Sequence, residues 1–299
     1  MNATKEIRAA QAALWGFYPL RKEQLINELR RCFEDSTWGP GSIPRGFIGG
    51  SRVIGGIAPH AGYSYSGPCA AHLYKVIGEN VRDVNTVIIL GTNHTGLGGA
   101  ITTTKRYVWS TPLGEVDIDD EFINELLRIN IVSDEPLAHL EEHSVEVQLP
   151  FLQFVLKNKF KLVPIVVRET NVSILRSIAR AIKDISDRLQ RNILLIASSD
   201  FTHHGSMYGY VLYATDVARK VRELDMIFIN YILKLDTEGF IRSIREYGAT
   251  VCGPGAIAIL MEYVKSVGGR AKLLKYYNSA ELTGQEDIAV GYASIAFMY

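Results

Sequence analysis

The sequence predicts an α/β fold, a single domain over residues 1–299 with a largely parallel central sheet flanked by helices. Short apolar runs rich in β-branched residues alternate along the chain with segments of helical period. No stretch rich in Pro, Ser or Gly separates two halves, and no internal period repeats. With 47% hydrophobic and 21% charged residues, the chain has the composition of a folded protein and not of a disordered one.

The predicted strands are the apolar runs. Four of them have a composition that suits strands buried on both faces by helices, namely residues 53–58, 86–90, 162–167 and 193–197. Residues 101–118 are Thr-rich and aromatic around Pro112-Leu113-Gly114, which predicts an antiparallel excursion. Two further strands, residues 272–277 and 288–297, close the chain.

The predicted helices lie between these strands. Leu25, Leu29 and Phe33 recur every fourth residue and predict a helix over residues 21–33. The same period predicts four further helices, over residues 67–77, 119–131, 145–156 and 172–189. After Asp200 the pattern is helical as far as residue 267, with breaks at residues 236–237 and 252–255.

Composition excludes several classes of protein. The 32 basic and 32 acidic side chains leave no positive surplus for a nucleic-acid partner. The longest apolar stretch, residues 256–261, is far shorter than the roughly 20 residues that span a bilayer. Three separated cysteines without a C-x-x-C pair argue against a disulfide framework. We therefore expect a cytoplasmic protein without nucleic-acid or membrane partners.

Polar residues that can bind metals follow three of the predicted strands. His60 follows the strand over residues 53–58, His94 follows residues 86–90, and Asp200 and His203 follow residues 193–197. The carboxyl ends of parallel strands share one edge of a sheet, and ligands bind beyond that edge. A lone histidine at such a position is most often a structural residue with a hydrogen bond. Three strand ends that carry histidine instead predict a common site.

Cys252 precedes a predicted helix start at Gly253-Pro254. A thiol at a helix N-terminus feels the helix dipole, which predicts a lowered pKa and a better ligand or nucleophile. The alternative is that Cys252 is a small buried hydrophobic residue.

A further polar cluster spans residues 141–150. His143 and Glu146 are three residues apart, so a helix would place them on one face. The alternative is an acid-rich, solvated helix N-terminus. The sequence has no phosphate-binding loop, no H-E-x-x-H and no G-x-S-x-G, so nucleotide-dependent, zincin and serine-hydrolase chemistry lack support.

Taken together and in order, these motifs resemble the Memo family, over essentially the whole chain. The segments that carry the resemblance are Ala58-Pro59-His60-Ala61-Gly62-Tyr63, Leu90-Gly91-Thr92-Asn93-His94, Glu142-His143-Ser144-Val145-Glu146, Ser198-Ser199-Asp200-Phe201 through His203, and Cys252-Gly253.

The resemblance implies a fold like that of the class III extradiol dioxygenases, which are non-haem iron enzymes. It implies an iron or copper ion held by His60, His94 and Cys252. It also implies that Asp200, His203, His143 and Glu146 line the same cleft and face the substrate or support the ligands. The occupant of the cleft would be a small molecule or a peptide.

Three functions follow as alternatives. The first is a redox-active metal protein with oxygen-dependent activity. A thiolate in place of a carboxylate softens such a site and favours copper(I), zinc or a thiolate-tolerant iron. The second is a module that binds a peptide or small ligand in a vestigial cleft. The third is a zinc hydrolase with Asp200 or Glu146 as the base.

Overall fold

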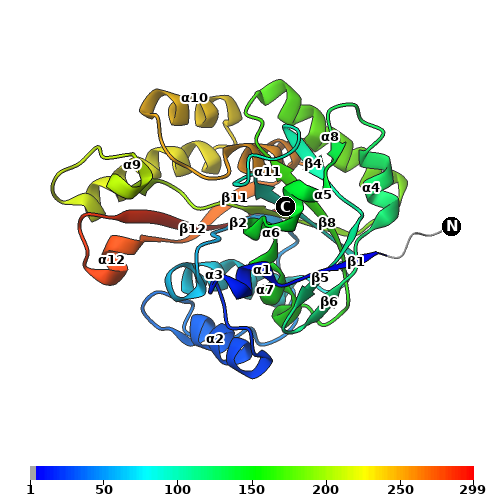
Figure 1. Cartoon of the computed structure of the whole chain (residues 1–299), viewed down its shortest axis with the longest axis horizontal. Coiled ribbons are helices and arrows are strands. Elements are labelled where there is room, and N and C mark those ends of the chain that lie inside the picture. Colours follow the sequence, from blue (N-terminus) through cyan, green and yellow to red (C-terminus); the bar gives the residue numbers. More distant parts are fainter. Residues whose placement is uncertain (1–4) are drawn as a thin grey trace.

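Four parallel strands occupy the centre of the main sheet in the computed structural model, which describes residues 5–299 (Figure 1). They are β2, β9, β3 and β8 in spatial order, within a nine-stranded sheet. A separate three-stranded sheet contains β1, β5 and β6. The strands of the two sheets are β1 Glu6–Arg8, β2 Val53–Ala58, β3 Thr86–Thr92, β4 Ile101–Thr103, β5 Tyr107–Thr111, β6 Gly114–Val116, β7 Ser133–Asp134, β8 Lys161–Val167, β9 Ile193–Ser198, β10 His203–His204, β11 Arg270–Asn278 and β12 Ala289–Met298.

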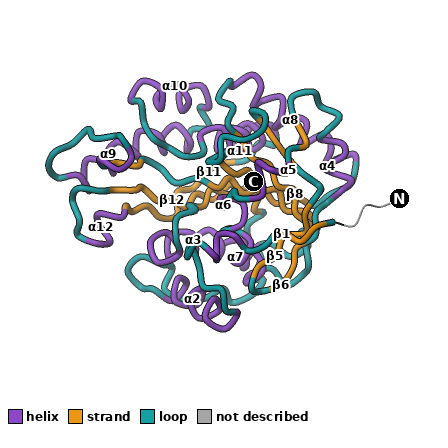
Figure 2. The backbone as a smooth tube through the Cα atoms, in the orientation of Figure 1, coloured by secondary structure: helices purple, strands orange, loops and turns teal. Residues whose placement is uncertain are grey.

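Helices cover both faces of the main sheet (Figures 1 and 2). The α-helices are α1 Gln11–Leu14, α2 Lys22–Glu34, α3 Tyr63–Asn80, α4 Asp120–Leu126, α5 Pro136–Leu140, α6 His143–Glu146, α7 Leu149–Val155, α8 Val172–Arg188, α9 Val217–Leu233, α10 Thr237–Tyr247, α11 Pro254–Ser266 and α12 Ser279–Thr283. In Figure 1, α8 to α11 lie above the sheet, and α2, α3 and α7 lie below it. The buried Leu25, Leu29 and Phe33 confirm the predicted apolar stripe of α2.

The sheet is mixed, so the prediction of a largely parallel sheet is wrong. Strand β12 runs antiparallel to β2, β10 and β11, and β4 runs antiparallel to β8. The reason lies in the connections, because parallel neighbours need a crossover of a dozen or more residues. Only the short helix α12 and its loop separate β11 from β12. An apolar run buried on both faces carries no signal of strand direction, which is why the sequence did not reveal this arrangement.

Two predicted helices end earlier or divide. The segment 145–156 forms α6 and α7, because Pro150 is in the first turn of α7 and starts a new helix there. The segment 119–131 forms only α4, where the Asp119 side chain accepts a hydrogen bond from the Phe122 N–H and caps the helix. The antiparallel excursion predicted over residues 101–118 is confirmed by β4 and by the β5–β6 hairpin. None of the helices in the described part is both long and apolar enough to cross a membrane.

Candidate metal centre

His60 lies directly beyond β2 and is 2% exposed. The Asp200 carboxylate, which follows β9, accepts a hydrogen bond from the His60 backbone N–H at 2.7 Å. The ends of two adjacent parallel strands are thereby joined, as the predicted common edge requires.

Hydrogen bonds fix the tautomer of His60. Its Nδ1 lies 3.2 Å from Ser198 Oγ, and that hydroxyl donates its only proton to the Ser144 carbonyl at 2.6 Å. His60 Nδ1 must therefore carry the proton and donate it to Ser198, and Nε2 keeps a lone pair. His60 Nε2 is buried and has no hydrogen-bond partner. Burial, with the charge of His94, holds the pKa of His60 well below its usual value, so the ring is neutral and able to bind a metal.

His94 is oriented in the same way, but by a carboxylate. Glu142 accepts hydrogen bonds from the His94 backbone N–H at 2.8 Å and from Nδ1 at 2.9 Å. Burial would raise the pKa of Glu142, but the hydrogen bond and charge of His94, with the charge of His143, outweigh burial and lower it to about 2. The ionised Glu142 therefore keeps the His94 proton on Nδ1 and leaves Nε2 free.

His143 lies against His94, with ring centroids 4.5 Å apart and nearly parallel planes. Phe17 packs on it as well, at 4.5 Å. Burial and the neighbouring His60 and His94 lower the pKa of His143 to about 3, so this ring is also neutral at physiological pH.

Asp200 is buried, and burial raises its pKa although nearby histidines oppose the shift. Within residues 5–299 no lysine or arginine pairs with it, and the neutral His60 ring lies beside it, with 4.0 Å between Nε2 and Oδ2. A buried carboxylate without a cationic partner is costly, and a bound cation would remove that cost.

Cys252 lies at the same edge of the sheet as His60 and Asp200. The glycine that follows it, Gly253, allows the backbone to approach the ends of β3 and β9 closely. A Cβ on Gly253 would lie 2.8 Å from Thr92 Oγ1 and 3.0 Å from the Ser198 carbonyl, so only glycine lets α11 begin this close to β3 and β9. The Cys252 backbone N–H donates to the Asp200 carbonyl at 3.2 Å.

The predicted lowering of the Cys252 pKa is wrong for the protein without metal. Burial and the charge of Asp200 raise that pKa well above its usual value. The thiol precedes Gly253, the N-cap of α11, so desolvation outweighs the helix dipole.

His203 is the partner of that thiol. The carbonyls of Phe201 and Thr250 lie 3.0 and 3.2 Å from His203 Nδ1, so Nδ1 carries the proton. Cys252 Sγ lies 3.7 Å from His203 Nε2 and 3.8 Å from Nδ1, so the thiol is in contact with the imidazole ring.

Glu146 lies in another environment. It is fully buried, and its carboxylate pairs with Arg8 Nη1 at 2.5 Å and accepts hydrogen bonds from the Tyr18 hydroxyl and the Ala12 N–H. The structure therefore brings His143, but not Glu146, to the histidines, although both belong to the single turn α6.

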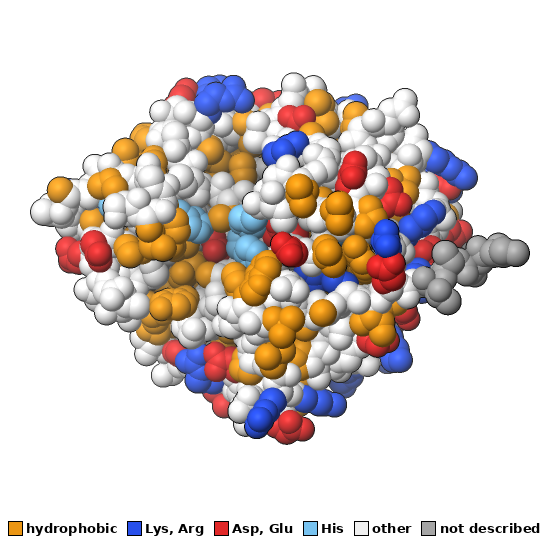
Figure 3. Space-filling model, in the orientation of Figure 1, with side chains coloured by type: hydrophobic (Ala, Val, Ile, Leu, Met, Phe, Trp, Pro, Cys, Tyr) orange, Lys and Arg blue, Asp and Glu red, His pale blue; other side chains and the backbone are white. Residues whose placement is uncertain are grey.

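Two groups of side chains converge closely enough to hold a metal ion, and they share His60. One is His60, His94 and His143; the other is His60, Asp200 and Cys252. Within each group the ligand atoms lie within 4.8 Å of one another. Imidazole nitrogens, a thiol and a carboxylate are suitable ligands for a first-row transition metal. Figure 3 shows histidine side chains reaching the surface in a hollow between hydrophobic side chains.

Glu142, Ser198 and Gln148 support the site but were not predicted. The Gln148 amide donates to Ser198 Oγ at 2.7 Å and to the Pro59 carbonyl at 3.0 Å. These residues position the ligands through hydrogen bonds between distant parts of the chain, for which a sequence holds no local pattern. Glu142 had one signal, its place directly before His143.

Another buried carboxylate, that of Asp225 in α9, anchors the segment after Asp200. It accepts hydrogen bonds from the Thr202 N–H at 3.1 Å and from the Tyr276 hydroxyl at 2.7 Å. Burial raises its pKa to about 6, although these hydrogen bonds oppose the shift. The protonated form thus stabilises the fold fully below about pH 4, the unfolded-state pKa, and this contribution is lost as the pH rises through 6.

We expect Asp225→Asn to remove this pH dependence. The shift of about two pKa units corresponds to about 3 kcal/mol. Relative to the variant, the wild type should lose about that much free energy of unfolding between pH 4 and pH 7. Urea unfolding of both proteins over this range measures it, and a constant difference between them would contradict the assignment.

Comparison with known proteins agrees with the resemblance found in the sequence. The Memo-like protein family matches residues 8–296. A MEMO1 family protein of Methanopyrus kandleri is 40% identical over 94% of this chain and 95% of its own length. One from Desulfurococcus amylolyticus is 41% identical over the same shares, and one from Thermococcus kodakarensis is 38% identical over 96% and 98%.

A solved structure of an uncharacterized protein of Escherichia coli K12 gives a TM-score of 0.45 at 11% identity, over 75% of this chain and 90% of that one. At this TM-score the likeness carries no inference. The family match and the identities, over almost the full length of each relative, show that this chain belongs to the Memo family.

Proposed function

We propose that this protein binds one transition-metal ion at His60 and uses it in a redox or oxygen-dependent activity. The buried Nε2 of His60, which has no hydrogen-bond partner, carries this proposal. His60 is the one residue that belongs to both convergent groups. An unpaired buried nitrogen is costly, and metal coordination would satisfy it.

His94 and Cys252 would complete the ligand set, with Asp200 beside them. When bound, the ion supplies a redox-active or Lewis-acidic centre. The residues of this chain prepare the site: Ser198 and Glu142 hold Nδ1 of the two imidazoles, so that Nε2 is the nitrogen that would bind the ion. The Cys252 thiol, which must lose its proton on becoming a ligand, is in contact with the His203 ring.

Iron or copper is the proposed metal. A thiolate favours copper(I) or thiolate-tolerant iron over a purely hard ion, and the carboxylate of Asp200 adds a ligand suited to iron. A fold like that of the class III extradiol dioxygenases stays part of this proposal.

The metal content of protein purified without added metal tests the proposal first, followed by titration of metal-free protein with iron(II), copper(I) and zinc. We expect Cys252→Ser to weaken binding on the order of 100-fold or more, because a hydroxyl cannot replace the thiolate charge. Cys69→Ser is the matched control, since Cys69 is a buried free thiol in a separate cluster. Full affinity in a folded Cys252→Ser protein would remove Cys252 from the site.

Glu142→Gln should weaken metal binding about 10–100-fold, the usual effect of removing a carboxylate that orients a ligand histidine. Glutamine can still accept one hydrogen bond but no longer holds a negative charge beside His94. The same titration measures this change, and an unchanged affinity would mean that His94 needs no such support.

Two alternatives predict other results. A zinc hydrolase would retain zinc on purification and cleave esters or phosphoesters. Asp200 would be its base, because the Glu146 carboxylate is already bound by Arg8 and Tyr18. A peptide or small-ligand binding module would bind its ligand equally well with and without metal. Activity assays under both conditions distinguish these cases from the proposal.

A further inference from the structure

A cavity of about 1020 Å³ lies at the other end of β3 from the candidate metal centre. Thr86, the first residue of β3, lines this cavity, whereas His94 follows the last residue of the strand, Thr92. Its volume is at the upper end of the range of about 300–1,000 Å³ typical of small-molecule sites. A ligand there would lie outside the metal centre.

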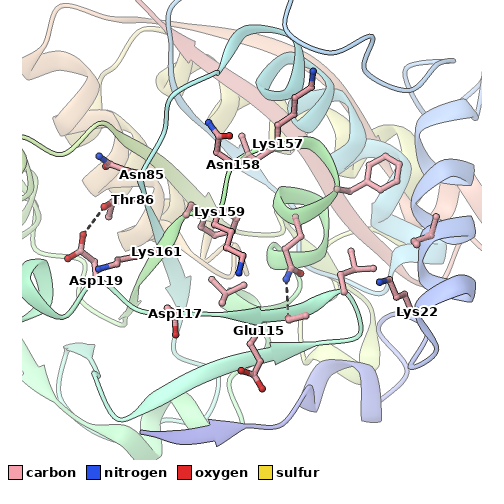
Figure 4. A pocket seen from close by; sticks show the side chains of 18 of the residues that line it. Lys22, Asn85, Thr86, Glu115, Asp117, Asp119, Lys157, Asn158, Lys159 and Lys161 are labelled. Carbon is pink, nitrogen blue, oxygen red and sulfur yellow. Dashed lines mark hydrogen bonds between the residues drawn. The ribbon is translucent and has the colours of Figure 1, made fainter. Parts of the chain in front are cut away.

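Positive side chains surround the cavity. Six cations line it, Lys22, Arg30, Lys157, Lys159, Lys161 and Arg191, against three carboxylates, Glu115, Asp117 and Asp119. Asp119 already pairs with Arg191 at 2.8 Å. Among residues 5–299, the other five cations have no ion-pair partner. Figure 4 shows Lys159 pointing into the space and Lys22 on the wall formed by α2.

The cavity also has an apolar wall. Ile26, Leu113 and Phe154 line it and are half-buried, so part of each side chain is available to a ligand. Phe154 is held by stacking on Phe33 of α2, with ring centroids 5.6 Å apart. This wall therefore exists before any ligand binds, which reduces the entropic cost of binding.

We propose that this cavity binds a small organic anion with an apolar body and a phosphate or carboxylate head group. The unpaired cations attract and hold the head group, and the apolar wall covers the body. None of the residues that line the cavity belongs to the two convergent groups, so this site is independent of the proposed metal function.

Calorimetric titration with 1-naphthyl phosphate tests the proposal, with inorganic phosphate and 1-naphthol as the separate head and body. We expect one molecule of 1-naphthyl phosphate per chain, at least tenfold tighter than either fragment, with affinity falling as salt is added. Arg30→Gln and Lys159→Gln should each weaken binding about fivefold, the effect of one partly solvated ion pair.

Two controls identify the site. Lys272→Gln removes an exposed lysine of β11 that does not line the cavity and should leave the affinity unchanged. His60→Ala should also leave it unchanged. The absence of 1-naphthyl phosphate binding at 1 mM would overturn the proposal. Binding that is lost in His60→Ala but retained in Arg30→Gln and Lys159→Gln would also overturn it, because the anion would then occupy the metal centre.

Discussion

Glu146→Leu is expected to lower the free energy of unfolding by about 3–5 kcal/mol, because it leaves the buried Arg8 guanidinium without its counter-ion. Both side chains of this pair are fully buried. The substitution also removes the acceptor of the Tyr18 hydroxyl and of the Ala12 N–H. Urea unfolding measures the loss.

The exposed pair Lys183–Asp187 of α8 provides the matched control. Its side chains are 36% and 67% exposed, so Asp187→Leu should cost no more than about 0.5 kcal/mol. The double variant Arg8→Met/Glu146→Leu should recover part of the loss, since no unpaired charge remains. Equal costs at both sites would show that the Arg8–Glu146 pair contributes no more than a surface contact.

His60→Ala is expected to abolish metal binding at concentrations that saturate the wild type. His60 belongs to both convergent groups, so its loss leaves two members in each. A metal at 100 times its dissociation constant stabilises the wild type by about 2.7 kcal/mol, and the variant should show no such gain. Thermal melts with and without iron(II) or copper(I) measure the difference.

His72→Ala is the control for this substitution. His72 lies inside α3, where its Nε2 lies 3.1 Å from the Trp38 carbonyl, away from the metal centre. It should keep the full metal-dependent gain in stability. If His60→Ala kept that gain as well, the ion would bind elsewhere and the proposed centre would be wrong.

The central strands were predictable because each is a short apolar run, and β2 has the predicted bounds. The strand-end positions of His60, His94 and Asp200 were predictable for a related reason: parallel strands expose their carboxyl ends at one edge. The direction of β12 was not predictable, because a strand that is buried along almost its whole length has the same apolar pattern whether it runs parallel or antiparallel to its neighbours.

The environment of each candidate residue was harder to predict than its position. Glu146 has the same spacing from His143 in either environment, and its position is determined by the distant N-terminal segment, where Arg8, Tyr18 and the Ala12 N–H bind its carboxylate. The pKa of Cys252 likewise depends on its burial and on the charge of Asp200, which lies far earlier in the chain. Such pairings depend on tertiary contacts and leave no periodic pattern in the sequence.

The long sequence separations within the centre have a consequence for folding kinetics. The bond between His60 and Asp200 joins residues 140 positions apart, and the Arg8–Glu146 pair closes a loop of 138. Loops of this length form slowly, because the chain loses conformational entropy on closing the loop before the contacts that compensate for this loss can form. We therefore expect the centre to assemble late, after the sheet has formed. During synthesis Cys252 joins the centre only after residue 252 has left the ribosome, so we expect the full set of candidate ligands to assemble after most of the chain has been made.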